Sequence, residues 1–192
     1  MMNRMKLFIP TFLLLVFLAA CGGEIEENMS RDIEPLSAVN QNGDEVKLKD
    51  YEGTYWVADF IFTSCDTVCP PMTGNMARLQ QKMKDEGIDN VQLVSFSVDP
   101  ETDTPEKLKA FADAYQPDYE MWDFLTGYEF EEVRELSYKS FQSALEDMPD
   151  TDQMSHGTRF YLVTPEGKVI KHYKGTEADE MDRIIEDLKK IS

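Results

Sequence analysis

The chain has 192 residues, 42% of them hydrophobic, which is enough for one globular domain with an ordinary core. Its 37 acidic residues outnumber 19 basic ones, so the formal net charge is -18 and the pI is about 4.4. A surface this acidic repels phosphate backbones, which argues against nucleic-acid binding. It indicates a protein suited to a salty or alkaline exterior, and it identifies no partner.

The first twenty residues differ in composition from the rest of the chain. Arg4 and Lys6 precede an apolar run from Leu7 to Ala20. A helix that spans a membrane needs roughly 20 apolar residues, so this shorter run is typical of the apolar region of a secretory signal peptide. We therefore expect residues 1–20 to be a signal peptide.

The segment Leu18-Ala19-Ala20-Cys21 resembles the lipobox of bacterial lipoproteins, whose cysteine becomes the mature N-terminus and carries lipid. The resemblance implies lipidation of Cys21 and a stable anchor, because more than one acyl chain holds a protein on a membrane. The polar residues 21–32 would then tether a domain at 33–192 to the extracytoplasmic face of a bacterial plasma membrane. An uncleaved anchor and a plain signal peptide are the alternatives.

From residue 33 onward, strands are predicted to alternate with helices. The pair Asn42-Gly43 favours a hairpin turn, and proline and glycine mark the helix ends. The predicted strands are 33–39, 45–48, 56–62, 91–98, 122–125, 159–164 and 168–173; the predicted helices are 71–86, 103–115, 130–141 and 178–191; and 142–158 is predicted to be irregular. This order predicts an α/β fold with a central mixed sheet flanked by helices and an N-terminal β-hairpin extension.

Cys65 and Cys69 follow the predicted central strand, a placement typical of a thioredoxin-like layout. In a regular helix, Cβ atoms four residues apart are about 5–6 Å apart, whereas a disulfide needs about 3.5–4.5 Å. Because Pro70 and Pro71 indicate a helix start, we expect Cys65 in a loop, free to approach Cys69 or to share a metal ion with it. The helix dipole would favour the Cys69 thiolate. The alternative is an inert structural disulfide, although so short a loop gains little from closure.

The sequence contains two histidines. His172 lies in a predicted strand and is expected to be a solvated strand residue. His156 precedes the C-terminal hairpin, in a loop that can fold back over the sheet end that carries the cysteines. The recurring Met72, Met76 and Met83 indicate core packing rather than a thioether metal site.

The segment Thr63–Pro70 (TSCDTVCP) resembles the Thr-x-Cys-x3-Cys-Pro signature of the Sco (SenC-like) family, copper chaperones named for the synthesis of cytochrome c oxidase. The blocks Asp59–Phe62 and Ser97–Pro105 resemble further family features, and the similarity covers residues 35–191. It implies a thioredoxin-like Sco domain in which Cys65, Cys69 and His156 bind copper. Thiolates suit Cu(I), and imidazole accepts both copper states.

The same resemblance implies a function and partners. The domain would be a metallochaperone for the dinuclear copper centre of cytochrome c oxidase subunit II, with a copper donor protein and a thiol reductant as further partners. A disulfide between Cys65 and Cys69 would remove the thiolates and release copper. Asp66 and Asp99 are candidates to accept hydrogen bonds behind the metal ligands or to tune a thiol pKa. Their alternative is a solvated loop acid or a turn cap.

Three other functions remain open from the sequence. A thiol-disulfide oxidoreductase would use the cysteine pair to keep the copper-site cysteines of the oxidase reduced, and this role is compatible with copper binding. Whether the protein is an enzyme therefore stays open. A peroxidase is disfavoured by the second cysteine and by Pro70. A structural zinc site is disfavoured because such sites usually have four ligands, and three are apparent.

Overall fold

The computed structural model describes residues 24–148 and 154–192. The predicted signal peptide and the predicted lipidation site Cys21 lie outside these residues. In the described part of the chain, no helix is both long enough and apolar enough to cross a membrane.

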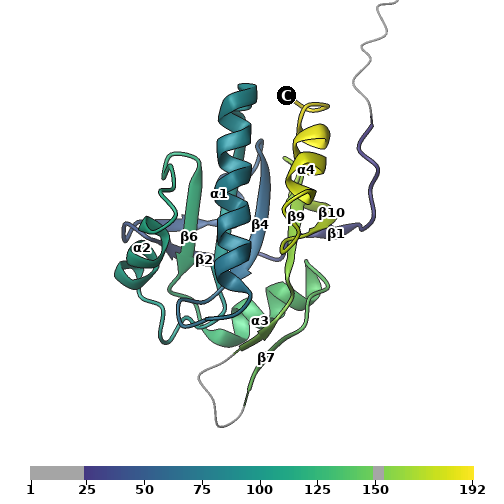
Figure 1. Cartoon of the computed structure of the whole chain (residues 1–192). Coiled ribbons are helices and arrows are strands. Elements are labelled where there is room, and N and C mark those ends of the chain that lie inside the picture. The colour runs from purple at the N-terminus through teal and green to yellow at the C-terminus, as the bar shows by residue number, and fades with distance from the viewer. Residues whose placement is uncertain (1–23, 149–153) are drawn as a thin grey trace, which may run out of the picture.

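An eight-stranded sheet forms the centre of the molecule (Figure 1), in the order β1-β10-β9-β4-β5-β6-β2-β3. The central strand β4 (Tyr55–Ile61) is parallel to β5 (Val91–Ser97), and β5 is parallel to β6 (Trp122–Thr126). On its other side β4 is antiparallel to β9 (Arg159–Val163). The mixed sheet of the predicted α/β fold is therefore confirmed.

Short strands extend the sheet at both edges. At one edge β2 (Ser37–Asn40) and β3 (Glu45–Lys47) form the predicted N-terminal hairpin, followed by the 3-10 helix η1 (Leu48–Tyr51). At the other edge β10 (Lys168–Lys174) pairs with β9 and also with the two-residue strand β1 (Arg31–Asp32), which was not predicted.

Helices α1 (Cys69–Glu86) and α4 (Glu180–Leu188) lie side by side over one face of the sheet, as Figure 1 shows. An ion pair of 2.7 Å between Lys82 and Asp182 links them. Helix α2 (Pro105–Asp113) lies beside β6, and α3 (Phe130–Lys139) follows that strand in the chain.

The two faces of β4 are packed differently because its side chains alternate. Trp56 and Phe60 point to one face, where their ring centroids lie 6.4 and 5.2 Å from that of Phe141, just after α3. Asp59 lies on the other face, toward α1. The methionines of α1 are fully buried there, which confirms that their spacing reflects core packing.

Two predictions about local structure are wrong. Residues 142–158 were expected to be irregular, but β7 (Leu145–Asp147) and β8 (Met154–His156) form a second, two-stranded sheet in which Leu145 lies opposite His156. Helix α1 begins at Cys69 rather than at residue 71. Prolines are tolerated in the first turn because their missing N–H groups would have no helical acceptor there.

Candidate metal centre

Three elements bring the predicted ligands together at one end of the sheet. Cys65 lies in the turn after β4, Cys69 is the first residue of α1, and His156 ends β8. The Cys69 sulfur lies 3.6 Å from Nε2 of His156. The backbone N–H of Cys69 donates to the Cys65 sulfur at 3.3 Å. Thus Cys69 contacts each of the other two residues.

The donor set fits a soft metal ion. Both cysteines are free thiols, and thiolates with an imidazole suit copper or zinc. Nδ1 of His156 lies 3.0 Å from the carbonyl oxygen of Gly157, so Nδ1 carries the hydrogen and donates it. Nε2 is then left with its lone pair facing Cys69, the arrangement found in metal-binding histidines. Within the described residues, no three acidic, cysteine or histidine side chains are already gathered around one point.

The two thiols differ in acidity. Burial raises the pKa of Cys69, which is completely inaccessible to solvent, and its hydrogen bond to Cys65 raises it further. Burial also acts to raise the pKa of Cys65, but hydrogen bonds from Cys69 and Thr67 outweigh it and leave this pKa lowered. The expectation that the helix start favours the Cys69 thiolate is therefore wrong. The first N–H of α1 points at Cys65 instead.

The histidine is held neutral by its surroundings. Burial lowers the pKa of His156, although the hydrogen bond to Gly157 opposes this shift. The ring of Phe62 packs edge-on against the imidazole, with centroids 5.7 Å apart. A neutral imidazole keeps the Nε2 lone pair that a metal ion needs.

The loop that carries Cys65 is fixed by Asp103, which the sequence analysis placed at the start of a predicted helix and in a block resembling the Sco family. Its carboxylate accepts hydrogen bonds from the N–H and hydroxyl of Thr63 and from the hydroxyl of Ser97. The actual cap of α2 is Thr104, which accepts from the N–H of Lys107 at 3.4 Å. Asp103 thus ties the ends of β4 and β5 together beneath the site.

The loop that carries His156 depends on a close approach at Gly157. A Cβ atom at this position would lie 2.2 Å from the hydroxyl oxygen of Ser143. Glycine is therefore the residue that lets this loop pass Ser143 and present the imidazole to Cys69.

The two carboxylates predicted to support the site make no described hydrogen bond to it. Asp66 is exposed, and neither Asp66 nor Asp99 makes a described hydrogen bond to Cys65, Cys69 or His156. Asp99 accepts from the N–H of Thr102 at 3.3 Å, which is the turn-capping alternative. The carboxylate that acts on Cys69 is the buried Asp59, whose charge helps to raise the Cys69 pKa.

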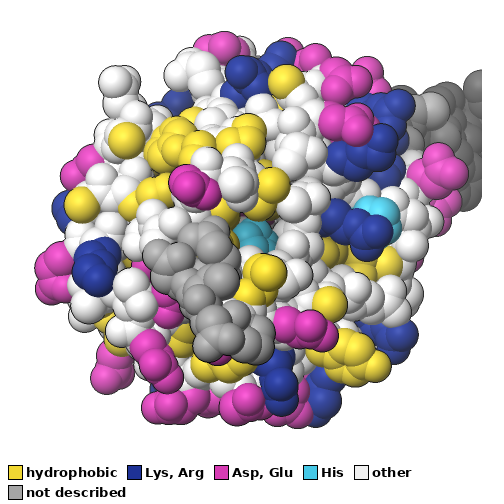
Figure 2. Space-filling view, turned by 60° about the horizontal axis from the view of Figure 1, so that its bottom comes forward, with side chains coloured by type: hydrophobic (Ala, Val, Ile, Leu, Met, Phe, Trp, Pro, Cys, Tyr) yellow, Lys and Arg dark blue, Asp and Glu magenta, His cyan; other side chains and the backbone are white. Residues whose placement is uncertain are grey.

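Figure 2 shows one face of the molecule, with a histidine near its middle among hydrophobic side chains and many acidic side chains around the periphery. A cavity of about 420 Å³ beside the site is lined by residues that include Ser64, Asp99, Phe130 and Met154.

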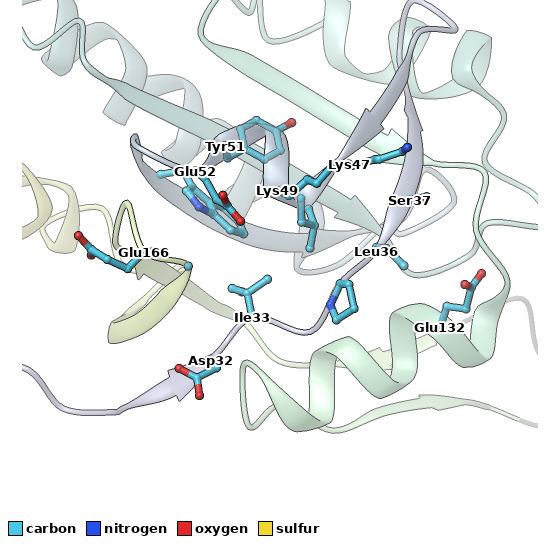
Figure 3. Close-up of a pocket in the computed structure, with 14 residues that line it drawn as sticks. Asp32, Ile33, Leu36, Ser37, Lys47, Lys49, Tyr51, Glu52, Glu132 and Glu166 are labelled. Atoms are coloured by element: carbon cyan, nitrogen blue, oxygen red, sulfur yellow. The ribbon is translucent and has the colours of Figure 1, made fainter.

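A second cavity, of about 590 Å³, lies between the N-terminal segment and the hairpin (Figure 3). Ile33, Leu36 and Tyr51 line it together with charged residues such as Glu132 and Glu166. Because neither cysteine nor histidine reaches it, this cavity is separate from the candidate metal centre.

The SCO1/SenC family model matches residues 26–192. The SCO1 protein homolog of Bacillus subtilis is 48% identical over 181 residues, which cover 94% of this chain and 93% of the relative.

The solved structures that resemble this chain also include members of the Sco family. The SCO1/SenC family lipoprotein of Bacillus anthracis has a TM-score of 0.79 at 48% identity and covers 83% of this chain and 94% of its own. BsSco, described with a disulfide switch as a member of the Sco family of cytochrome c oxidase assembly proteins, has a TM-score of 0.80 at 46% identity, covering 88% and 97%. Copper-bound ScoI of Arabidopsis thaliana has a TM-score of 0.69 at 25% identity, covering 83% and 97%.

These structures confirm the predicted thioredoxin-like fold. The family model spans nearly all of the described residues, and the Bacillus relatives match them at close to half identity. The chain therefore belongs to the SCO1/SenC family.

Proposed function

We propose that this chain binds copper through Cys65, Cys69 and His156 and takes part in the assembly of cytochrome c oxidase. The observation that carries the proposal is the contact of 3.6 Å between the Cys69 sulfur and Nε2 of His156, beside the Cys65 thiol. Cys69 contacts Cys65 on one side and His156 on the other, and the histidine presents its unprotonated nitrogen to it.

Copper is the cargo in this proposal, and the three ligands differ in how readily they lose the proton that copper would replace. Cys65 is the thiol that ionises more readily, so it would be the first ligand, while Cys69 must lose a proton that its burial retains. His156 needs no deprotonation, because burial keeps its imidazole neutral. Soft thiolates favour Cu(I), whereas imidazole accommodates Cu(I) and Cu(II).

The relatives support both parts of the proposal. The Arabidopsis ScoI structure contains copper, and BsSco is described as one of a family of oxidase assembly proteins. We further propose that the client is the dinuclear copper centre of cytochrome c oxidase subunit II, and that a copper donor protein and a thiol reductant are the other partners.

A redox role is the second candidate, favoured by the adjacency of two free thiols. The Cys65 thiolate would attack a client disulfide, Cys69 would then resolve the mixed disulfide, and the client would leave with two reduced thiols. Each cycle oxidises the pair by two electrons and requires an external thiol reductant. Oxidation of the pair by the client disulfide, or by another disulfide that accepts the same two electrons, would also release copper, since the product disulfide has no thiolate to offer.

We also propose that Cys21 is lipidated and holds the domain on the extracytoplasmic face of the plasma membrane. Support comes from the lipobox-like sequence and from the Bacillus anthracis relative, which is described as a lipoprotein. Metabolic labelling with a radioactive fatty acid should mark the wild-type chain and leave the Cys21→Ser variant unlabelled. Labelling of both chains would contradict this assignment.

The copper proposal is tested by titrating the reduced protein separately with Cu(I), against a competing chelator, and with Cu(II), by thiolate charge-transfer absorption. We expect one copper per chain, little binding in the Cys65→Ser/Cys69→Ser variant, and binding weakened on the order of tenfold or more in His156→Ala.

The matched control is His172→Ala, because His172 lies in β10 and makes no described contact with the cysteines. It should bind copper like the wild type. Binding that is indifferent to His156 would remove the three-ligand site and favour the redox role, which a disulfide reduction assay would then measure directly.

A further inference from the structure

Residues 25–33, here called the N-terminal strap, overlap the predicted tether and lie along the outer edge of β10. The backbone N–H groups of Asn28 and Met29 both donate to the carbonyl oxygen of Ile170, each at 3.1 Å. The side-chain amide of Asn28 donates from Nδ2 to the carbonyl oxygen of His172 at 3.1 Å, and its Oδ1 accepts from the N–H of His172 at 2.9 Å. A single side chain therefore satisfies both outward-facing backbone groups of His172.

Both ends of the strap are held by the domain as well. Ile25 is only 8% exposed and belongs to the hydrophobic core. In β1, Arg31 pairs with Val169, and after it the N–H of Ile33 donates to the carbonyl oxygen of Gly167 at 2.9 Å. The strap thus covers the edge of β10, which would otherwise be free to pair with another chain.

The docked strap shortens the reach of the proposed lipid anchor. Cys21 and Ile25 are four residues apart in the sequence, so their Cα atoms can be at most about 14 Å apart. A free tether from Cys21 to Ile33 would instead reach roughly 40 Å. With lipid on Cys21 in the bilayer, the side of the domain that holds the strap must therefore stay beside the membrane.

The charge of the domain differs between its two sides. Residues 154–192, which form β9, β10 and α4 on the side of the strap, carry seven acidic and seven basic side chains. Residues 99–148, which include β6, α2 and α3 toward the other edge of the sheet, carry 14 acidic and four basic side chains. Figure 1 shows β1 and β10 on one side of the molecule and β2 and α2 on the other. Anionic lipids repel the acidic side more strongly, so the charges favour the same orientation as the strap.

We propose that the N-terminal strap fixes the β1–β10 edge of the sheet against a lipid surface and turns the β2–β3 edge away from it. The placement at the membrane rests on the proposed lipidation of Cys21, whereas the docking of the strap on β10 does not.

This orientation sets the height of the metal centre above the membrane. The strand β4, which leads into the centre, is the fourth strand from the edge that holds the strap. At about 4.8 Å for each strand spacing, the centre is held roughly 15 Å from that edge. A client that exchanges copper with the centre must then present its own site at the same height.

The first test asks whether the strap is docked and requires no membrane. The full-length chain, purified in detergent, is digested briefly with trypsin, and mass spectrometry follows cleavage after Arg31. Asn28→Ala should accelerate this cleavage on the order of tenfold, because it removes both side-chain hydrogen bonds to His172. The matched control is Glu26→Gln, which changes an exposed side chain without a described hydrogen bond and should leave the rate unchanged. Equal rates in Asn28→Ala and the wild type overturn the docking.

The second test measures the orientation on a membrane. The full-length lipidated chain is inserted into vesicles of phosphatidylglycerol and phosphatidylethanolamine that carry an acceptor dye on their outer headgroups. In a Cys65→Ser/Cys69→Ser background, a donor dye is attached either at Glu166→Cys, beside the strap, or at Glu45→Cys, on β3. Energy transfer should be about twofold or more higher from position 166, because roughly 30 Å separates the two edges of the sheet.

Release of the strap provides the control for that measurement. Ile25→Asp combined with Asn28→Ala should abolish most of the difference between the two donor positions. Equal transfer from both positions in the chain with the intact strap overturns the placement at the membrane, and an unchanged difference after release shows that the strap is not its cause. A chain that does not bind vesicles contradicts the lipidation of Cys21 and with it the membrane placement, while the trypsin experiment still decides whether the strap is docked.

Discussion

The first N–H of α1 makes the two neighbouring cysteines unequal. This N–H belongs to Cys69 and donates its hydrogen bond to the Cys65 sulfur. The Cys69 side chain is itself fully buried at the start of the helix. The thiolate stabilisation usually offered by a helix N-terminus therefore goes to the residue four positions earlier. As a consequence, the pKa of Cys65 is lowered and that of Cys69 is raised, so Cys65 is the thiol that ionises more readily.

A single substitution at Gly157 is predicted to affect both stability and copper binding. A methyl group there would meet the Ser143 hydroxyl, so Gly157→Ala must displace the loop that presents His156. We expect a loss of about 1–3 kcal/mol in the free energy of unfolding and copper binding weakened on the order of tenfold. Urea unfolding and chelator competition measure the two effects.

The control for that prediction is Ser143→Ala, alone and combined with Gly157→Ala. Because the Ser143 hydroxyl faces Tyr161 without a hydrogen bond of normal geometry, its removal alone should cost little, and the double variant should recover part of both losses. A double variant as impaired as Gly157→Ala would show that the clash is not the cause.

At the scale of elements, α1 joins the site to the core. Its first residue, Cys69, is a predicted ligand, its middle buries methionines against the sheet, and its end is set by Gly87 at φ 70. There the N–H of Ile88 donates to the carbonyl of Met83, which closes the helix. The two-stranded sheet of β7 and β8 holds His156 in place, because His156 pairs there with Leu145.

Substitution by alanine should change stability in opposite directions at Gly87, which ends α1, and at Gly74, which lies inside α1. Gly87→Ala should lower the free energy of unfolding by about 1 kcal/mol, because only glycine adopts a positive φ without strain. Gly74→Ala lies inside α1 with its nearest described neighbour at 4.0 Å, and it should raise stability by about 0.5–1 kcal/mol. Chemical denaturation compares them, and equal signs would contradict the backbone explanation.

At the scale of the whole molecule, acidic groups dominate the response to pH. Burial raises the pKa of Asp59 and, against several hydrogen bonds, that of Asp103. Asp187 behaves in the opposite way: burial raises its pKa, but hydrogen bonds from Lys171, Lys190 and Tyr173 outweigh this and leave it lowered. The two kinds of carboxyl group therefore affect stability in different pH ranges.

Between pH 4 and pH 7, Asp59 makes the free energy of unfolding fall as the pH rises. Its pKa is near 4 in the unfolded chain and about 7 in the folded one, so over this range the folded state binds more protons. The free energy of unfolding should fall as pH rises through the range, by up to about 4 kcal/mol from this group.

In Asp59→Asn that fall should be smaller by the same amount, as measured by urea unfolding at pH 4.5 and pH 7.5. Asp187 does not interfere, because its contribution is present above its unfolded pKa and is lost only at lower pH. Parallel pH profiles for the two chains would show that Asp59 is ionised throughout.

Sequence alone determined the features that are local or periodic. Alternating strands and helices, the hairpin at Asn42-Gly43 and the buried stripe of α1 follow from hydrogen-bonding geometry and apolar spacing within one segment. The candidate ligands Cys65, Cys69 and His156 came from the resemblance of the sequence to the Sco family, because spacing alone left the role of the loop histidine open.

Only the tertiary structure decided how distant segments affect one another. The pairing of β7 with β8, the clamp of Asp103 on Thr63, and the charge of Asp59 beneath Cys69 each join residues that are far apart in the chain or on different elements. Neither propensity nor periodicity records such contacts. The acidity of Cys69 was predicted wrongly for the same reason, since a pKa depends on burial and on the direction of nearby N–H groups, which exist only after the chain has folded.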